Sequence, residues 1–175
     1  MENSLISTEK LKKRGYIHGN VEDSLLRTLI LRVQDTIVEP IIGTPLFKRL
    51  IQGIEDNDLN NDEITLMDDY IVPVMVSGCD YRSVNVLTYE IRNKGVGITK
   101  DEHFEPTSES GNVRLKDELK SDLQHYSARL IGYLKDNYEL YPEYTECNDN
   151  FEDLKPQKEQ IKSNISIIWS RQLTK

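Results

Sequence analysis

The chain has 175 residues with 37% apolar and 30% charged residues, and its formal net charge is −8. This length suffices for one domain with its own core and is marginal for two. The acidic balance argues against a nucleic-acid binder that neutralises phosphates, and the low apolar share predicts a small core plus exposed or extended segments. The polar first residues and the lack of a ~20-residue apolar run lead us to expect an intracellular protein without a membrane span.

Three helices are expected in the first third of the chain. Residues 1–19 are typical of a short helix and a turn, which Ser7 or Thr8 caps and Gly15 ends. A longer helix starts near Asn20 and ends at Pro40, and its apolar residues recur at every fourth position: Val21, Leu25, Leu29, Val33 and Ile37. A third helix begins with Thr44 as its cap and Pro45 at the first helical position.

Residues 61–97 are predicted to form the central packing element. Asn61 or Asp62 caps the start, and an apolar stripe follows at helical steps: Ile64, Met67, Ile71, Val74, Val76, Val84, Leu87 and Ile91. Pro73 predicts a kink or a break, after which it opens a second helix. Cys79, within this stripe, is expected to be a buried free thiol.

The last strong helix is expected over Val113–Tyr138, after a long irregular stretch from Val96 to Asn112 that is either functional or mobile. Its apolar residues again follow helical steps: Leu115, Leu119, Leu123, Tyr126, Leu130 and Leu134. The fold class is therefore mainly α, a bundle of about four to five helices with a long loop. We divide the chain into a helical domain, 1–140, and an extended C-terminal arm, 141–175.

The C-terminal arm carries the candidate interface residues. Near its end, apolar residues alternate with serines in a pattern more typical of a strand than of a helix, and such a strand could pair with a neighbouring molecule. The expected interface comprises Tyr141, Tyr144, Ile165, Ile167 and Trp169. We consider two roles for Trp169. It is either an anchor in another chain's pocket or a side chain that folds back onto its own domain.

Catalytic patterns are weak, and we expect no enzyme, no cofactor and no metal. Asp56, Asp58, Asn60 and Asp62 alternate as in a calcium loop, but Asn61 and Met67 stand where the loop needs glycine and glutamate. The histidines occupy separate segments at positions 18, 103 and 125, and we interpret them as surface residues. The basic cluster Lys10–Arg14 suits either a phosphate contact or a solvated face beside an acidic neighbouring subunit.

The order of helices and several short signatures resemble the head–tail connector, or adaptor, proteins of tailed bacteriophages, in particular those of crAss-like phages. The resemblance covers roughly residues 5–140. Its signatures are Leu5-Ile6-Ser7, the helix Val21–Glu39 with Pro40-Ile41-Ile42-Gly43-Thr44, Leu46–Leu50, Tyr70-Ile71-Val72-Pro73 and Ile91-Arg92-Asn93-Lys94-Gly95-Val96.

The resemblance implies a non-catalytic virion subunit that forms a dodecameric ring below the portal, at the head–tail junction. Its partners would be other copies of itself, the portal, and tail or neighbouring ring proteins. DNA would pass through the channel without sequence-specific binding. We expect the long loop to contribute contacts through Lys100, Asp101, His103 and Phe104. The alternatives are a small cytosolic helical adaptor or regulator and, less favoured, a metal-dependent enzyme that uses Asp56, Asp58 and Asp62.

Overall fold

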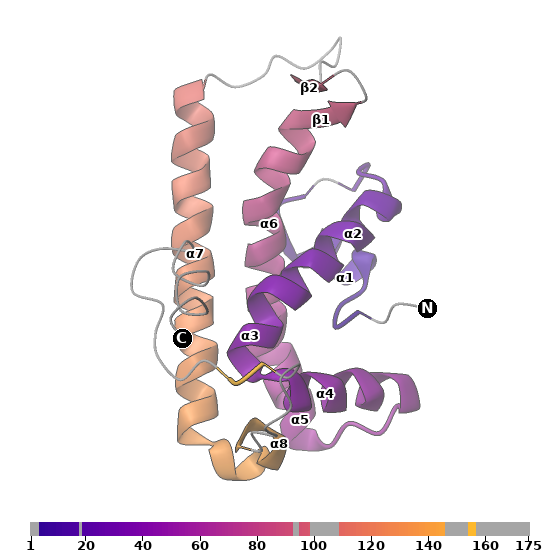
Figure 1. The fold of residues 1–175 in the computed structure, drawn as a ribbon, viewed down its shortest axis with the longest axis vertical. Helices are drawn as coiled ribbons and strands as arrows, with labels where there is room; N and C mark the ends of the chain where they lie inside the picture. Colours follow the sequence, from indigo (N-terminus) through magenta and orange to yellow (C-terminus); the bar gives the residue numbers. More distant parts are fainter. Residues whose placement is uncertain (1–3, 18, 93–94, 99–108, 146–153, 157–175) are drawn as a thin grey trace, which may run out of the picture.

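The computed structural model describes residues 4–17, 19–92, 95–98, 109–145 and 154–156, and it is mainly helical. Two long helices, α6 (Val72–Thr88) and α7 (Glu109–Asp136), lie side by side along the long axis (Figure 1). The helix α2 (Asp23–Val33) crosses α6 on the side away from α7. The shorter elements are α1 (Thr8–Arg14), α3 (Glu39–Ile42), α4 (Thr44–Asp56), α5 (Asn61–Thr65), the 3-10 turn Tyr138–Leu140 and α8 (Pro142–Thr145).

The central position of the segment after Asn61 is confirmed, because the first half of α6 is buried at nearly every position. Its apolar core residues are at most 8% exposed: Val72, Val74, Met75, Val76 and Cys79. Gly78 allows α2 to approach closely, since a Cβ atom there would lie 2.7 Å from Cγ1 of Val33. Cys79 is a free buried thiol, as expected, and burial raises its pKa to about 12.

Two prolines lie inside continuous helical segments, which corrects the prediction that Pro40 ends its helix. A π-helical turn precedes each proline, at Gln34–Val38 and at Leu66–Ile71. Within these turns the Glu39 amide donates to the Gln34 carbonyl, five residues back. A proline ring clashes with the carbonyl four residues before it, and a widened turn relieves this clash. The chain therefore stays helical from Asp23 to Ile42 and from Asn61 to Thr88, and Pro73 causes an irregular turn rather than a break.

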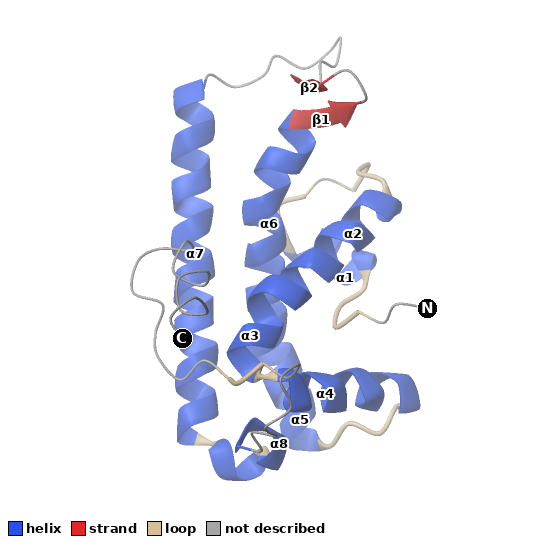
Figure 2. Ribbon diagram, viewed as in Figure 1, coloured by secondary structure: helices blue, strands red, loops and turns tan. Residues whose placement is uncertain are grey.

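The ends of several elements differ from the prediction. Asn60 caps α5 in a reciprocal pair of hydrogen bonds with Glu63, whereas Asn61 or Asp62 was expected. The helix expected to reach Ile91 ends at Thr88, and an antiparallel hairpin follows, β1 (Tyr89–Arg92) and β2 (Gly95–Ile98). The hairpin is the small strand element in Figure 2. Helix α7 begins at Glu109, ahead of the expected Val113. In contrast, the Ser7 cap and the Gly15 end of α1 are confirmed.

The packed unit extends beyond residue 140. The Thr44 amide donates to the Leu154 carbonyl at 3.1 Å, and the Leu154 amide donates to Thr44 Oγ1 at 2.9 Å. Gly43 has a φ of 83°, and a Cβ atom at this position would lie 2.9 Å from Cδ of Pro156. Thr44 thus joins the chain at Leu154–Pro156 to the start of α4 instead of capping that helix with its hydroxyl. None of the described helices combines the length and apolar character that crossing a bilayer would require.

Candidate functional site

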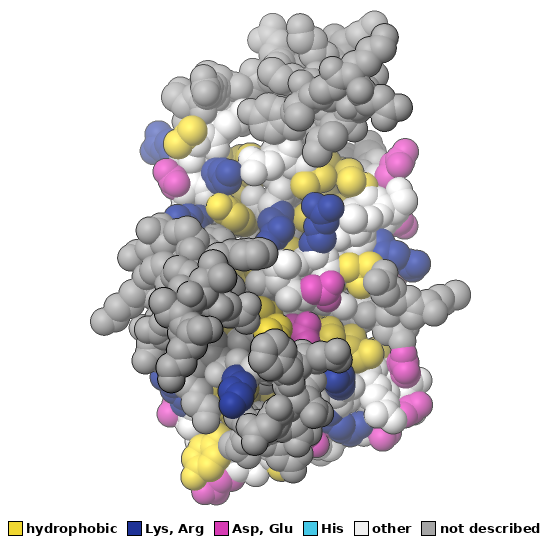
Figure 3. Space-filling model, viewed as in Figure 1, with side chains coloured by type: hydrophobic (Ala, Val, Ile, Leu, Met, Phe, Trp, Pro, Cys, Tyr) yellow, Lys and Arg dark blue, Asp and Glu magenta, His cyan; other side chains and the backbone are white. Residues whose placement is uncertain are grey.

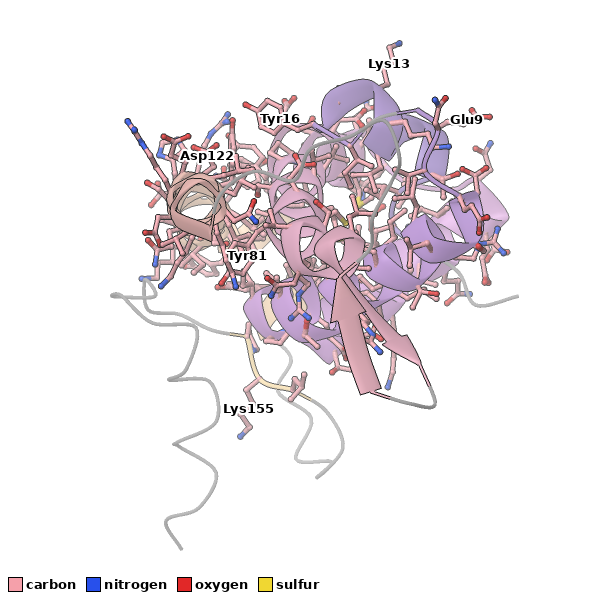
Figure 4. All side chains as sticks on the ribbon, turned by 90° about the horizontal axis from the view of Figure 1, so that it is seen from above. Glu9, Lys13, Tyr16, Tyr81, Asp122 and Lys155 are labelled. Atoms are coloured by element: carbon pink, nitrogen blue, oxygen red, sulfur yellow. The ribbon has the colours of Figure 1, made fainter. Side chains whose placement is uncertain are left out.

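A groove of about 310 Å³ opens where α6 and α7 meet the segment that follows α1. We call it the Asp80 groove. Its lining residues come from three parts of the chain: Arg14, Tyr16, Pro73, Val76, Ser77, Asp80, Leu119, Asp122 and Tyr126. Figure 4 shows two of them, Tyr16 and Asp122, on the same side of the molecule. The groove therefore combines an apolar wall with two carboxylates, two tyrosines and one arginine.

Asp80 is the buried acid of this groove, and its side chain is held in place by the segment after α1. The residue is 3% exposed. Its Oδ1 accepts a hydrogen bond from the Tyr16 amide at 3.1 Å, while its second oxygen accepts none from the residues that the structure describes. Gly15 makes this contact close, because a Cβ atom there would lie 2.9 Å from Oδ1. Tyr16 itself is 82% exposed, so its ring stands at the edge of the groove.

The Asp80 carboxyl is poised to bind a proton near neutral pH. Burial raises its pKa from 3.8 to about 6, the Tyr16 amide opposes this rise, and the nearby charge of Asp122 adds to it. A buried carboxylate with one hydrogen bond is costly to keep charged. A positive charge placed in the groove would offset that cost.

The free energy of unfolding should therefore fall as the pH rises from about 4 to about 6. The folded chain binds the Asp80 proton more tightly than the unfolded chain does, so protonation favours folding between about pH 4 and pH 6. Among the described residues that line the groove, the other charged groups are Asp122, from α7, and Arg14, from α1. We expect Asp80→Asn to match the wild type at pH 4 and to be more stable at pH 7 by on the order of 2 kcal/mol. Urea unfolding at both pH values measures this, and an equal difference at both would contradict it.

A family model described as "Family of unknown function (DUF6712)" matches residues 38–153. This is more than half of the chain. The chain belongs to this family. The match includes Asp80 and Asp122 but not Arg14 and Tyr16, which complete the groove from outside the matched residues. No curated protein and no solved structure matches the chain.

Tyr141 and Tyr144, which we predicted at an interface, lie in the chain's own core at 1% and 2% exposure. The Tyr141 hydroxyl donates to the Asp62 carbonyl at 2.9 Å and lies 3.0 Å from the Tyr133 hydroxyl. Burial is the main cause that raises the pKa of both phenols. The prediction of an interface was wrong for these two residues. Their aromatic rings, beside Pro142, close the end of the DUF6712 helical unit and are buried there without a second chain.

The other predicted contact residues lie outside the described residues. These are Ile165, Ile167 and Trp169 of the arm and Lys100, Asp101, His103 and Phe104 of the loop. His18 and Cys147 also lie outside them. Among the histidines, the structure describes His125, which is exposed and packs edge-on against Tyr126 with ring centroids 5.4 Å apart.

The charged clusters singled out in the sequence form ion pairs within the chain. From the basic cluster, Lys10 pairs with Asp68 at 2.6 Å and Lys12 with Asp23 at 2.7 Å. The acidic partners of these two lysines thus belong to the same chain, whereas the alternatives considered for the cluster were a phosphate contact or a solvated face beside an acidic neighbouring subunit. In the calcium-like loop, Asp58 pairs with Arg49 at 2.9 Å. Among the described residues, no group of three or more acidic, histidine or cysteine side chains is placed to hold a metal ion.

Sequence reasoning left Asp80 unassigned, although one signal was present. An aspartate inside the most apolar part of a central helix, next to Cys79, has to be buried and therefore needs a partner. The remaining groove residues could not be found in this way. Asp122 lies on a charged helix face, and Tyr16 lies in a turn, so neither position carries a pattern that points to Asp80.

Proposed function

We propose that the chain is a head–tail connector subunit: a structural virion protein that forms a ring below the portal and extends the DNA channel. The proposal rests on the resemblance of residues 5–140 to phage connectors and on one feature of the described surface. That feature is an exposed apolar end of the α6–α7 pair. The family to which the chain belongs has no established function, so the proposal depends on these observations alone.

The apolar end is formed by Leu87, Val113 and Leu115. Their exposed fractions are 40%, 57% and 47%. Leu87 lies near the end of α6, and the other two lie near the start of α7. A hydrogen bond of 3.3 Å from Lys116 Nζ to Asn85 Oδ1 joins the two helices at this level. All three therefore lie at the same end of the helix pair, and exposed apolar side chains at one end of a charged protein favour contact with another protein.

The charge of the chain also supports passage of DNA. Figure 3 shows acidic and basic side chains interspersed with apolar ones over one face of the molecule. The formal net charge of −8 has the opposite sign to the excess of Lys and Arg by which proteins bind phosphates. A net acidic ring repels DNA and lets it slide through the channel.

The proposal predicts ring assembly through the apolar end. Negative-stain microscopy and sedimentation velocity of the purified chain, alone and mixed with a portal from the same source, should detect rings or a collar on the portal. We expect the triple variant Leu87→Ser, Val113→Ser and Leu115→Ser to raise the concentration needed for assembly about tenfold, because roughly 1–2 kcal/mol of apolar burial is lost at each contact.

Ile64→Ser is the matched control, since Ile64 is also an exposed apolar residue, at 45%, but lies outside the apolar end. It should leave assembly unchanged. Compact monomers of the wild type under both conditions would contradict the connector function. That result would instead support the alternative of a small helical adaptor that binds another protein.

A further inference from the structure

The Asp80 groove has the chemistry of a receptor for a basic side chain. Val76 and Leu119 supply an apolar wall, against which the methylene groups of lysine or arginine pack well. Asp80 and Asp122 supply two carboxylates, and an oxygen of the buried Asp80 has no hydrogen-bond donor among the described residues. Tyr16 and Tyr126 add aromatic rings, which attract cations. Among the lining residues that the structure describes, Arg14 is the one cation beside two carboxylates, so these residues together carry a net negative charge.

The last part of the sequence has the complementary charge. Residues 157–175, which we call the C-terminal segment, contain four basic residues and one acidic residue, although the whole chain has a net charge of −8. The basic residues are Lys158, Lys162, Arg171 and Lys175. The rest of the chain is therefore strongly acidic, and attraction between the two is favourable.

The chain leading into the C-terminal segment is attached to the start of α4, on a different side of the subunit from the Asp80 groove. The hydrogen bonds between Thr44 and Leu154 fix the backbone that leads into the C-terminal segment. Figure 4 shows Lys155 on one side of α6, and Tyr16 with Asp122 on the opposite side. If the Lys155 side of one copy faces the groove side of the next, the copies join head to tail. Such contacts form a closed ring where the rotation between copies closes and a filament where it does not.

We propose that the Asp80 groove binds a lysine or arginine side chain from the C-terminal segment of a second copy of this chain. The inference deepens the connector function and rests on it, because it names the contact that links one ring subunit to the next. The methylene groups lie along Val76 and Leu119, and the cationic head group forms hydrogen bonds with Asp80 and Asp122. Binding weakens at high salt and at a pH low enough to protonate the carboxylates.

A binding measurement with the isolated segment tests the groove directly. The probe is a fluorescein-labelled peptide with the sequence of residues 157–175, and the readout is fluorescence anisotropy. The receptor is the full chain with Lys158, Lys162, Arg171 and Lys175 changed to glutamine, so that its own segment does not compete. We expect saturable binding, about tenfold weaker for Asp122→Asn and weaker still for Asp80→Asn with Asp122→Asn.

Two controls separate the groove from general acidity. Asp117→Asn removes the same charge from an exposed position of α7 outside the groove and should leave the affinity unchanged. A peptide with its four basic residues replaced by glutamine should not bind. Circular dichroism shows that each variant is folded, and because Asp122 is exposed, Asp122→Asn serves as the test if Asp80→Asn fails to fold.

Assembly then distinguishes this inference from the connector function. Rings of the wild type without peptide binding would overturn the inference and leave the function standing. Peptide binding with dimers or filaments in place of rings would support the inference and overturn the function. Peptide binding by a chain whose wild type is strictly monomeric would overturn both, because the segment would then occupy the groove of its own copy.

Discussion

Replacing Leu130 with alanine is expected to lower the free energy of unfolding by about 3 kcal/mol. Leu130 is fully buried in the core, on the helix α7 that packs on α6. A leucine-to-alanine change at such a site removes buried apolar surface and leaves a cavity, because the surrounding helices close only in part. For a chain of this length the melting temperature should fall by about 6 to 12 °C. Thermal and urea unfolding followed by circular dichroism measure both quantities.

Leu115→Ala is the matched control for this change. It makes the same substitution in the same helix at a residue that is 47% exposed, although helical spacing assigns both leucines to one stripe. We expect it to alter stability by less than about 0.5 kcal/mol. Equal losses at Leu115 and Leu130 in the monomer would contradict the packing of α7.

Replacing Arg49 with methionine should cost about 3 kcal/mol, because it leaves a buried carboxylate without its cation. The side chain of Glu63 is 5% exposed, and Arg49 contacts both of its oxygens, at 2.8 Å and 3.0 Å. The same guanidinium also bonds Asp58 at 2.9 Å and thus joins α4 to the loop that leads into α5. Removing one member of a buried pair costs far more than the pair itself contributes. Urea unfolding at pH 7 measures the loss.

A second substitution shows whether the buried charge causes this loss. In the wild type the Asn60 amide donates to Glu63 at 2.8 Å. The glutamine of Glu63→Gln keeps an oxygen that accepts this hydrogen bond, but it carries no charge. The double variant Arg49→Met with Glu63→Gln should therefore recover more than half of the lost stability. Lys10→Met breaks the half-exposed pair with Asp68 and should change stability by no more than about 0.5 kcal/mol. Failure of the double variant to recover stability would point to lost packing of the arginine stem.

The helices and most of the core could be predicted, because both follow from local spacing. Leu119, Leu123, Leu130 and Leu134 were expected on one face of a helix, and all four are buried. The same rule failed for Ile64, Leu87 and Leu115, which are 40–47% exposed. Periodicity shows which face of a helix is apolar, but not how far along that face the neighbouring helix extends.

The sequence by itself determined the mainly helical class, the central place of the segment after Asn61 and the burial of Cys79. These depend on the side chains of one segment and on the free energy of removing them from water. The tertiary structure alone decided that both prolines remain inside helices, that Tyr141 and Tyr144 close the core, and that Tyr16, Asp80 and Asp122 share one groove. Each of these outcomes depends on which parts of the chain, distant in sequence, pack against each other. The geometry of helix packing determines these contacts, and the residue pattern of a single helix does not.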